Sequence, residues 1–250
     1  MATTKKINPQ DSPDRFKLGE MGSLGLNLFN GVSQDEFKRE LNFPASITTF
    51  KQMSYHSAIN AALTMFDDSV NRVTWDFTPP ENATEEELQQ CKQIKEMMHD
   101  MEQPWTEFIK DVMSINTFGF SVHEKVYRKR YQSNGSLYND GVIAWKKLPI
   151  RSQETIEKFV FSDDGNDILG VKQNLSLVQD HYSRFSNRTN MEVVIPRSKF
   201  LLFRTGKHRG DPFGKSPLRD AYLAWRFLTS LEELEATGVS KDLVGLPVNI

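Results

Sequence analysis

The stretch from Trp105 to Tyr131, WTEFIKDVMSINTFGFSVHEKVYRKRY, decides how this chain folds. Its first part spaces apolar residues three and four apart, which predicts a short helix starting at Trp105. Its second part, from Phe120 to Tyr127, alternates as a strand does. Gly119 stands between them, and glycine ends helices because it adopts left-handed dihedral angles without a steric penalty. Catalytic residues would be expected at such a joint, but this one carries none, so we interpret it as structural.

The composition is that of a polar chain with nearly balanced charge. The 250 residues include 31 basic and 33 acidic side chains, giving a net charge of −2, and the mean hydropathy is −0.52. Such a chain has no strong long-range attraction to nucleic acid or to an anionic membrane. Its hydrophobic content of 38% is typical of a protein with much exposed or subunit-facing surface, or with solvated tails.

Cys91 is the single cysteine, which excludes an intrachain disulfide and a multi-cysteine zinc site. It lies on the apolar side of a predicted helix, where a buried, inert thiol is expected. The sequence shows neither the apolar run of a signal peptide nor a membrane span. We therefore expect a protein that is made and used in a reducing compartment.

Periodicity predicts helices in the first half of the chain. Apolar spacing indicates a helix over residues 48–73, and Thr84 with Glu87 forms a capping box at the start of the next helix. Pro104 opens a third helix, at a position where a missing N–H group costs nothing. A short strand is expected at Trp75–Phe77.

From Phe120 onward the period changes to two, which is typical of strands. The fold class is therefore α+β, with helices first, then antiparallel strands, then a helix. The predicted elements are a hairpin of residues 120–131 and 141–148 around an Asn-Gly turn, a second hairpin of 159–161 and 168–171, a strand at 200–203, and a helix from Ser216 to about Thr237.

We expect three segments. Residues 1–46 are predicted to be an extended N-terminal arm, and residues 47–240 one α+β domain. Residues 241–250 begin another apolar segment, which predicts that the natural chain continues beyond Ile250. The domain is expected to have one core that includes Trp105, Phe108, Phe118, Val122 and Phe203.

Two loops are candidate ligand sites. Gly210–Ser216 is similar to a phosphate-binding loop, but it is one residue short, and Pro212 and Pro217 remove backbone donors. Asp163–Asp167 lacks the ligand spacing of a calcium loop and favours a hairpin turn. The five histidines show no metal-binding spacing, and none is paired in sequence with a candidate nucleophile. The sequence therefore predicts no catalytic, cofactor-binding or metal-binding residue.

A basic run precedes the first predicted hairpin turn: Lys125, Arg128, Lys129 and Arg130. These side chains are candidates for a contact with DNA or with another subunit. The structural alternative is that they protect an exposed edge strand from aggregation.

Glu124 lies on the apolar face of the same strand, where a charge is costly unless it is paired. We expect a structural ion pair with Arg204, and Lys146 is the other candidate partner. The sequence alone does not choose between them.

Four segments, in the same order, resemble the portal (head-to-tail connector) proteins of tailed bacteriophages. They are the helix start Trp105–Ile109, the segment FGFSVHEKVY at 118–127, AWKKLPIR at 144–151, and FLLF at 200–203 followed by GDPFGKSPLRDAY at 210–222.

The resemblance implies a structural, non-enzymatic subunit of a dodecameric ring at one capsid vertex of a virion, assembled in the host cytoplasm. Double-stranded DNA would pass through the ring non-specifically during packaging and ejection. The implied partners are the major capsid protein, the packaging terminase and tail or adaptor proteins, with no cofactor and no membrane. The residues present would form the wing domain, and the stem, clip and crown would follow Ile250.

Two other functions stay open. One is a nucleotide-binding or nucleic-acid-processing enzyme that uses the Gly210–Ser216 loop. The other is a different virion adaptor or scaffold protein. The balanced charge suits a conduit, because many simultaneous contacts with phosphates would hold back a moving DNA.

Overall fold

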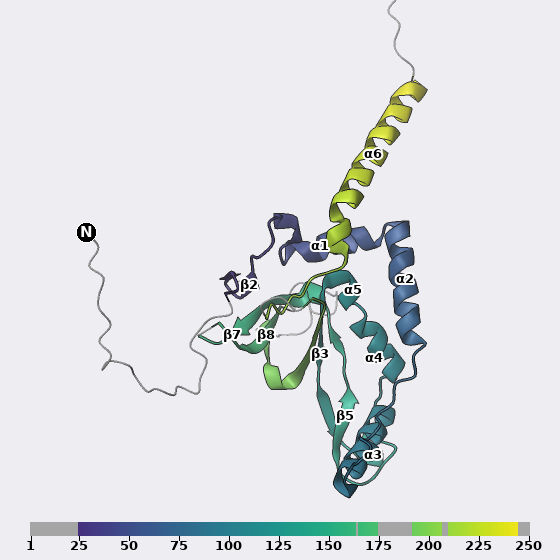
Figure 1. Cartoon of the computed structure of the whole chain (residues 1–250), viewed down its shortest axis with the longest axis vertical. Coiled ribbons are helices and arrows are strands. Elements are labelled where there is room, and N and C mark those ends of the chain that lie inside the picture. The colour runs from purple at the N-terminus through teal and green to yellow at the C-terminus, as the bar shows by residue number, and fades with distance from the viewer. Residues whose placement is uncertain (1–24, 164, 175–191, 207–209, 245–250) are drawn as a thin grey trace, which may run out of the picture.

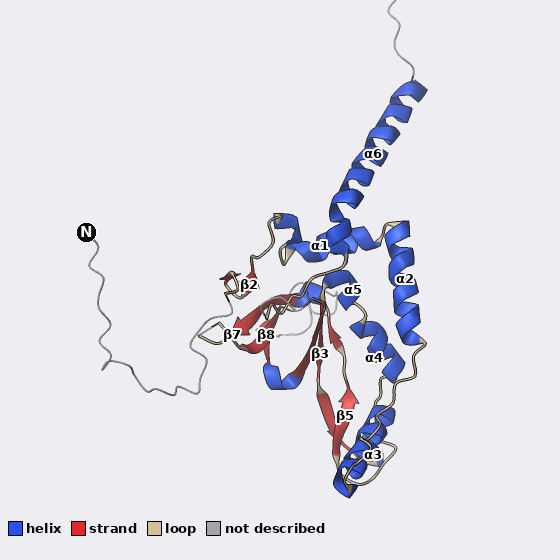
Figure 2. Cartoon of the chain, viewed as in Figure 1, coloured by secondary structure: helices blue, strands red, loops and turns tan. Residues whose placement is uncertain are grey.

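The computed structural model describes residues 25–163, 165–174, 192–206 and 210–244. Helices pack beside small antiparallel sheets, and a long helix, α6, leaves the body of the molecule (Figure 1). Figure 2 shows the strands at the centre of the body with helices along its side and across one end. This arrangement confirms the predicted α+β class.

The first half of the chain is helical, but the helix predicted over 48–73 is divided. Helix α1 spans Ala45–Ser54 and helix α2 spans Ser57–Asn71, and His56 between them is extended. Helix α1 buries side chains such as Phe50, whereas α2 has no fully buried residue. The apolar spacing continues through the break, so periodicity alone could not reveal it.

Helix α3 spans Glu85–Asp100 and begins with the predicted capping box. The Glu87 amide donates to the Thr84 hydroxyl over 3.4 Å, and the Glu87 carboxylate accepts from the Thr84 amide over 2.8 Å. The strand predicted at Trp75–Phe77 is absent from the structure. Trp75 is exposed there, and no neighbouring strand supplies hydrogen bonds to this segment among the described residues.

The joint at Gly119 has the predicted form. Helix α4 spans Trp105–Val112, with Pro104 as its N-terminal cap, and the short helix α5 spans Ile115–Phe118. Gly119 has a φ of 89°, in the left-handed region, and its amide donates to the Ile115 carbonyl over 2.8 Å. The chain thus turns from helix to strand within one residue.

The described strands form four antiparallel sheets. Their members are β1 (Leu28–Phe29) with β2 (Val32–Ser33); β3 (Phe120–Glu124) between β10 (Phe200–Arg204) and β6 (Ile150–Arg151); β4 (Val126–Lys129) with β5 (Ile143–Lys147); and β8 (Ile168–Asn174) between β7 (Ile156–Phe161) and β9 (Glu192–Pro196).

The strand predicted over 120–131 is divided between two of these sheets. Strand β3 pairs with β10 and β6, whereas β4 pairs with β5. The change occurs at Lys125, whose amide donates to the Lys199 carbonyl over 2.7 Å. Both predicted hairpins are confirmed, as β4–β5 and β7–β8.

Two apolar cores lie on opposite faces of β3. Phe118 and Val122 belong to a core with Phe120, whereas Phe203 and Trp105 pack in a second core around Phe108. The prediction of a single core is therefore wrong. Its five residues separate because alternate side chains of β3 and β10 project to opposite faces of the sheet.

Helix α6 spans Leu218–Val244 and extends beyond the predicted end near Thr237. A third cluster joins its base to α1, through Leu218 and Tyr222 on α6 and Phe50 on α1. Gly238 stays within the helix, because an interior glycine costs only about 1 kcal/mol and ends a helix only when it turns left-handed.

The predicted N-terminal arm falls partly outside the described residues. Residues 25–46 include the small β1–β2 sheet, and Phe43 is buried in the first core, where its ring stacks on that of Phe213 with centroids 4.4 Å apart. The end of the predicted arm is thus part of the folded body. No helix among the described residues has the length and apolar character needed to cross a membrane.

Candidate functional site

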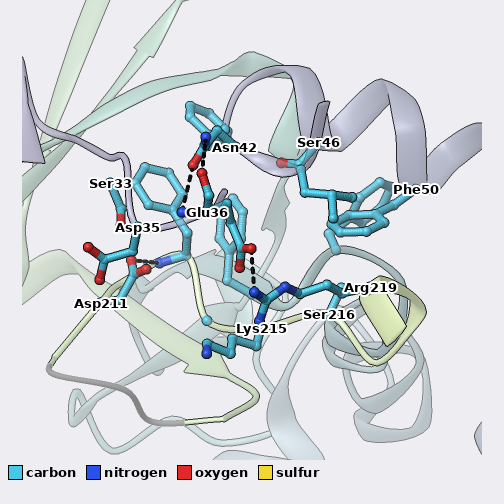
Figure 3. Close-up of a pocket in the computed structure, with 16 residues that line it drawn as sticks. Ser33, Asp35, Glu36, Asn42, Ser46, Phe50, Asp211, Lys215, Ser216 and Arg219 are labelled. Carbon is cyan, nitrogen blue, oxygen red and sulfur yellow. Dashed lines mark hydrogen bonds and ion pairs between the residues drawn. The ribbon is translucent and has the colours of Figure 1, made fainter. Parts of the chain in front are cut away.

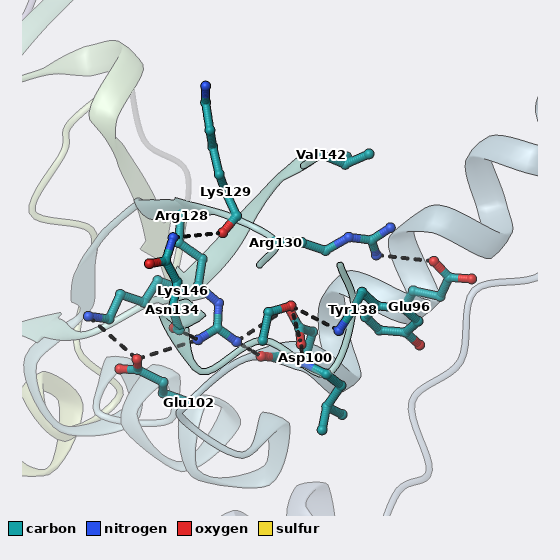
Figure 4. Close-up of polar contacts among 12 residues, drawn as sticks. Glu96, Asp100, Glu102, Arg128, Lys129, Arg130, Asn134, Tyr138, Val142 and Lys146 are labelled. Carbon is teal, nitrogen blue, oxygen red and sulfur yellow. Dashed lines mark hydrogen bonds and ion pairs between the residues drawn. The ribbon is translucent and has the colours of Figure 1, made fainter. Parts of the chain in front are cut away.

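The predicted basic run lies on two sides of strand β4. Successive side chains of a strand project to opposite faces. Arg128 is directed toward the end of α3, and Lys129 is directed away from it (Figure 4). Arg128 and Arg130 are buried, Lys125 is half-buried and Lys129 is exposed. The four residues therefore do not form one basic surface.

Arg128 is the centre of a buried ion-pair cluster at the end of α3. Its guanidinium lies 3.3 Å from the Asp100 carboxylate and 3.5 Å from that of Glu102. Asp100 also accepts hydrogen bonds from the Ser136 hydroxyl over 2.8 Å and from the Leu137 amide over 2.7 Å. Removing one partner of a buried pair costs about 3–5 kcal/mol, because the other charge is left unpaired. The cluster therefore fixes the β4–β5 hairpin to α3.

Arg130 makes a second set of ion pairs on the same side. It donates to both carboxylate oxygens of Asp140, through Nε over 2.9 Å, and lies 3.1 Å from the Glu96 carboxylate. Its guanidinium also lies 4.4 Å from the centroid of the Tyr138 ring. The hydrogen bond with Asp140 is the main cause that raises the pKa of Arg130. This guanidinium is thus held as a permanent cation within the protein.

These contacts correct the prediction for the basic run. Arg128 and Arg130 are buried and paired with internal carboxylates, so neither is available to DNA or to a neighbouring subunit. For Lys125 and Lys129 the contact stays a prediction. Alternation along the strand was the signal that could have separated the two kinds of residue.

Glu124 forms an ion pair with Arg151, which sequence analysis did not consider. The Arg151 Nε donates to the Glu124 carboxylate over 2.9 Å. The predicted partner Arg204 lies opposite Phe120 in the β10–β3 pairing and donates to two loop carbonyl oxygens, each over 2.8 Å. The other candidate, Lys146, pairs with the Glu102 carboxylate over 3.4 Å. The predicted pair is wrong because strand pairing, which sequence did not supply, chooses the neighbour.

His123 and Ser121 form a hydrogen-bonded pair that sequence analysis missed. The Ser121 hydroxyl lies 2.6 Å from His123 Nε2, and His123 Nδ1 lies 3.1 Å from the Leu148 carbonyl oxygen. Burial lowers the pKa of His123 to about 4, so the ring is neutral at pH 7. Its Nδ1–H donates to the carbonyl, and Nε2 accepts from the serine. Both side chains are fully buried, so the pair has no access to a substrate and serves the core.

The glycine-rich loop before α6 crosses the α5–β3 joint at close range. The Gly119 carbonyl accepts from the Thr205 amide over 2.9 Å, and the Lys215 amide donates to the Thr205 carbonyl over 2.9 Å. A Cβ atom on Gly214 would lie only 2.3 Å from the Gly119 carbonyl oxygen. Gly214 has a φ of 60°, so both the space and the dihedral angle require glycine here. The loop is a fixed crossing between two backbones.

The same contacts bear on nucleotide binding by this loop. The Phe213 amide donates to the Asp211 carboxylate over 3.0 Å, and the Lys215 amide donates to the Thr205 carbonyl. The Ser216 hydroxyl donates to the Thr117 carbonyl over 2.6 Å. Phosphate binding needs amides that converge on the ligand. In this loop the amides and the hydroxyl bind other groups of the protein, so the geometry favours a structural turn over a phosphate site.

A pocket of about 210 Å³ lies between this loop and the N-terminal segment (Figure 3). Arg219 pairs with Glu36 across it, and Phe43 forms part of its wall. Burial is the main cause that raises the pKa of Asp211 at one side. No three His, Cys, Asp or Glu side chains in the described part of the chain are grouped so as to hold a metal ion. The ion pair across the pocket thus joins the start of α6 to the N-terminal segment.

Helix α6 carries an apolar stripe with no partner in the described chain. Leu223, Phe227, Leu231 and Leu234 follow one side of the helix and are exposed, Phe227 by 67%. Nine residues, about two and a half turns, separate Phe227 from Leu218, which is buried against the body. The stripe therefore faces away from the body, where α6 projects alone (Figure 1).

An apolar groove of about 390 Å³ lies at the base of α6, beside α2. Its walls are mostly small or aliphatic side chains: Ala58, Ile59, Ala62, Leu63, Phe66, Asn116, Pro217, Leu218 and Ala221. Large exposed apolar areas on soluble proteins commonly mark contacts with other molecules. The groove and the stripe are thus the two surfaces best suited to assembly.

Comparisons with known proteins place the chain. A family profile described as the portal protein of Mu bacteriophage matches residues 47–232, more than half of the chain. A search of curated protein sequences gives no match. Among solved structures, a chain in the virion of a native gene transfer agent particle is similar, with a TM-score of 0.48 and 13% identity. The similarity covers 81% of this chain and 46% of that one, so this chain spans less than half the length of that relative.

Proposed function

The chain belongs to the bacteriophage portal protein family, and on this premise we propose that it is a structural subunit of a viral portal ring. In this proposal the ring stands at one vertex of the capsid and forms the channel for double-stranded DNA in packaging and ejection. The packaging terminase and the tail or adaptor proteins dock on it, and the major capsid protein surrounds it. The described residues correspond to the wing domain of such a subunit.

The observation that carries the proposal is the apolar stripe of α6. Its Phe227 and Leu234 are 67% and 68% exposed, and exposed apolar side chains along one helix side commonly mark a contact with another molecule. The stripe and the groove beside α2 are different surfaces of one molecule. A contact between two different surfaces of identical subunits is heterologous, and it closes into a ring when the rotation between subunits allows it.

The polar groups of the molecule support a structural role over an enzymatic one. The buried His123–Ser121 pair stabilises β3, and the charges of Arg128 and Arg130 fix the hairpin to α3. The loop that is similar to a phosphate site uses its amides in hydrogen bonds within the loop and to Thr205 after β10. Each of these groups has an internal partner, which is the expected use of buried polar groups in a rigid scaffold.

Electron microscopy of the purified protein tests the proposal. We expect closed rings with a central hole wide enough for duplex DNA, in a dodecameric arrangement. Phe227→Glu with Leu234→Glu should abolish the rings, because a buried unpaired charge is strongly destabilising at an interface. Ala236→Glu with Ser240→Glu, at exposed positions of α6 outside the stripe, is the matched control.

Other outcomes would contradict the proposal. Only monomers or dimers across a concentration series would exclude a ring. Rings that form in both glutamate double variants would show that ring formation does not depend on the α6 stripe. An assembled particle without a bore of DNA width would favour a different virion adaptor or scaffold protein. Heat of Mg-ATP binding that Lys215→Ala removes would favour the nucleotide-binding alternative.

A further inference from the structure

Exposed basic side chains form a small face on the outer side of the β4–β5 hairpin, opposite the buried Arg128 and Arg130. Tyr127 and Lys129 lie two residues apart on β4 and are both exposed. The Lys199 ammonium lies 5.4 Å from the centroid of the Tyr127 ring. These three side chains therefore share one face of the hairpin.

One further lysine adjoins this face through the backbone. Lys125 is held next to Lys199 by the hydrogen bond from its amide to the Lys199 carbonyl, 2.7 Å long. We refer to Lys125, Lys129 and Lys199 together as the lysine face.

The charge of the lysine face is not balanced within the protein. None of its three lysines forms an ion pair with a carboxylate among the described residues, whereas Lys146, between them in sequence, pairs with Glu102. The carboxylate next in sequence, Glu124, is already neutralised by Arg151. In a chain of net charge −2, three unpaired cations in one place make a local positive potential that attracts an anion.

We infer that the lysine face contacts the phosphate backbone of duplex DNA without reading its bases. The inference rests on the proposed portal function, which brings DNA to the protein. Lysine is depleted at protein–protein interfaces, so a face made mainly of lysines favours a polyanion over a protein partner. The proposed channel carries double-stranded DNA, so the duplex is the polyanion that this face would meet.

The strength of such a contact suits a protein along which DNA moves. Each phosphate that a lysine neutralises contributes about 0.9 to the slope of log K against log salt. Three contacts predict that affinity falls about 40-fold between 50 and 200 mM salt, and one contact only about 3.5-fold. The contact of a single subunit is therefore weak at physiological salt and easily broken.

Fluorescence anisotropy with a labelled duplex tests the inference. The affinity of the purified protein is measured between 50 and 200 mM salt, together with that of Lys129→Gln/Lys199→Gln. We expect the slope to fall by about 2 in this variant. The matched control is Lys92→Gln/Lys110→Gln, which removes the same charge from exposed lysines on α3 and α4 that form no ion pair in the described structure. The control should keep the slope of the unmodified protein.

Equal slopes in the two variants would overturn the inference. So would a loss of binding to a polyglutamate peptide with duplex binding unchanged, because the face would then serve an acidic protein. Ring formation is measured separately by electron microscopy. Rings with an unchanged slope contradict the DNA contact alone, whereas a reduced slope in a protein that forms no rings contradicts the portal proposal and leaves the DNA contact in place.

Discussion

The two regions on either side of Lys125 are stabilised by different physics. The sheet of β3 packs apolar side chains on both of its faces, with Phe120 and Val122 in one core and Phe203 in the other. The β4–β5 hairpin is fixed to α3 by buried ion pairs centred on Arg128 and Arg130. The hydrophobic effect is non-directional and scales with the apolar area buried, whereas a buried charge is strongly destabilising when its partner is removed. The first region should therefore set the global stability, and the second the position of the hairpin.

Removing a large side chain from the β3 sheet should have the largest effect. Phe120→Ala is expected to lower the free energy of unfolding by about 3–5 kcal/mol, through lost burial and the cavity left behind. Denaturant unfolding followed by circular dichroism measures this loss. Phe37→Ala, at a fully exposed phenylalanine, is the control and should change stability little. A similar loss in both variants would mean that the Phe120 core does not dominate.

Breaking the ion-pair cluster should have a large but local effect. Asp100→Ala leaves Arg128 buried without its closest carboxylate, at a cost of about 3 kcal/mol. Hydrogen exchange should show faster exchange in α3 and in the β4–β5 hairpin, with β3 and β10 protected as before. Asp68→Ala, at an exposed position of α2, is the control. Equal loss of protection in β3 would show that the two regions unfold as one unit.

Low pH should lower the free energy of unfolding of the β3 region, because His123 becomes protonated. Its pKa in the folded protein is lowered to about 4 from 6.5, so the unfolded chain binds the proton more tightly. The stability that the neutral ring contributes is complete above pH 6.5 and is lost as the pH falls from 6.5 through 4, by up to about 3 kcal/mol.

A variant isolates this titration. His123→Asn cannot become charged, so its free energy of unfolding should vary less between pH 7 and pH 4 than that of the unmodified protein, even if it is lower throughout. The exposed His99 supplies the control, as His99→Asn. Parallel pH profiles for the unmodified protein and His123→Asn would exclude His123 as the acid-sensitive group.

Sequence predicted the local features of both regions and missed the contacts between distant segments. The left-handed turn at Gly119, the hairpins and the α+β class follow from dihedral preferences and from alternation over a few residues. The division of the strand at Lys125 does not, because it depends on β10, a partner far along the chain. For the same reason sequence did not predict Arg151 as the partner of Glu124. The burial of Arg128 differs, because alternation along β4 could have separated it from the exposed Lys129.

A cap at the far end of α3 offers the smallest and sharpest test of the comparison. Thr84→Ala removes the hydroxyl that accepts from the Glu87 amide, and such caps contribute about 1 kcal/mol. The cap and the Asp100 cluster lie at opposite ends of α3 and share no partner, so their effects should add in a double variant. Hydrogen exchange at the start of α3 should rise in Thr84→Ala, and exchange in the hairpin should stay unchanged. Faster exchange in the hairpin would mean that the helix, more than the ion pairs, determines where the hairpin lies.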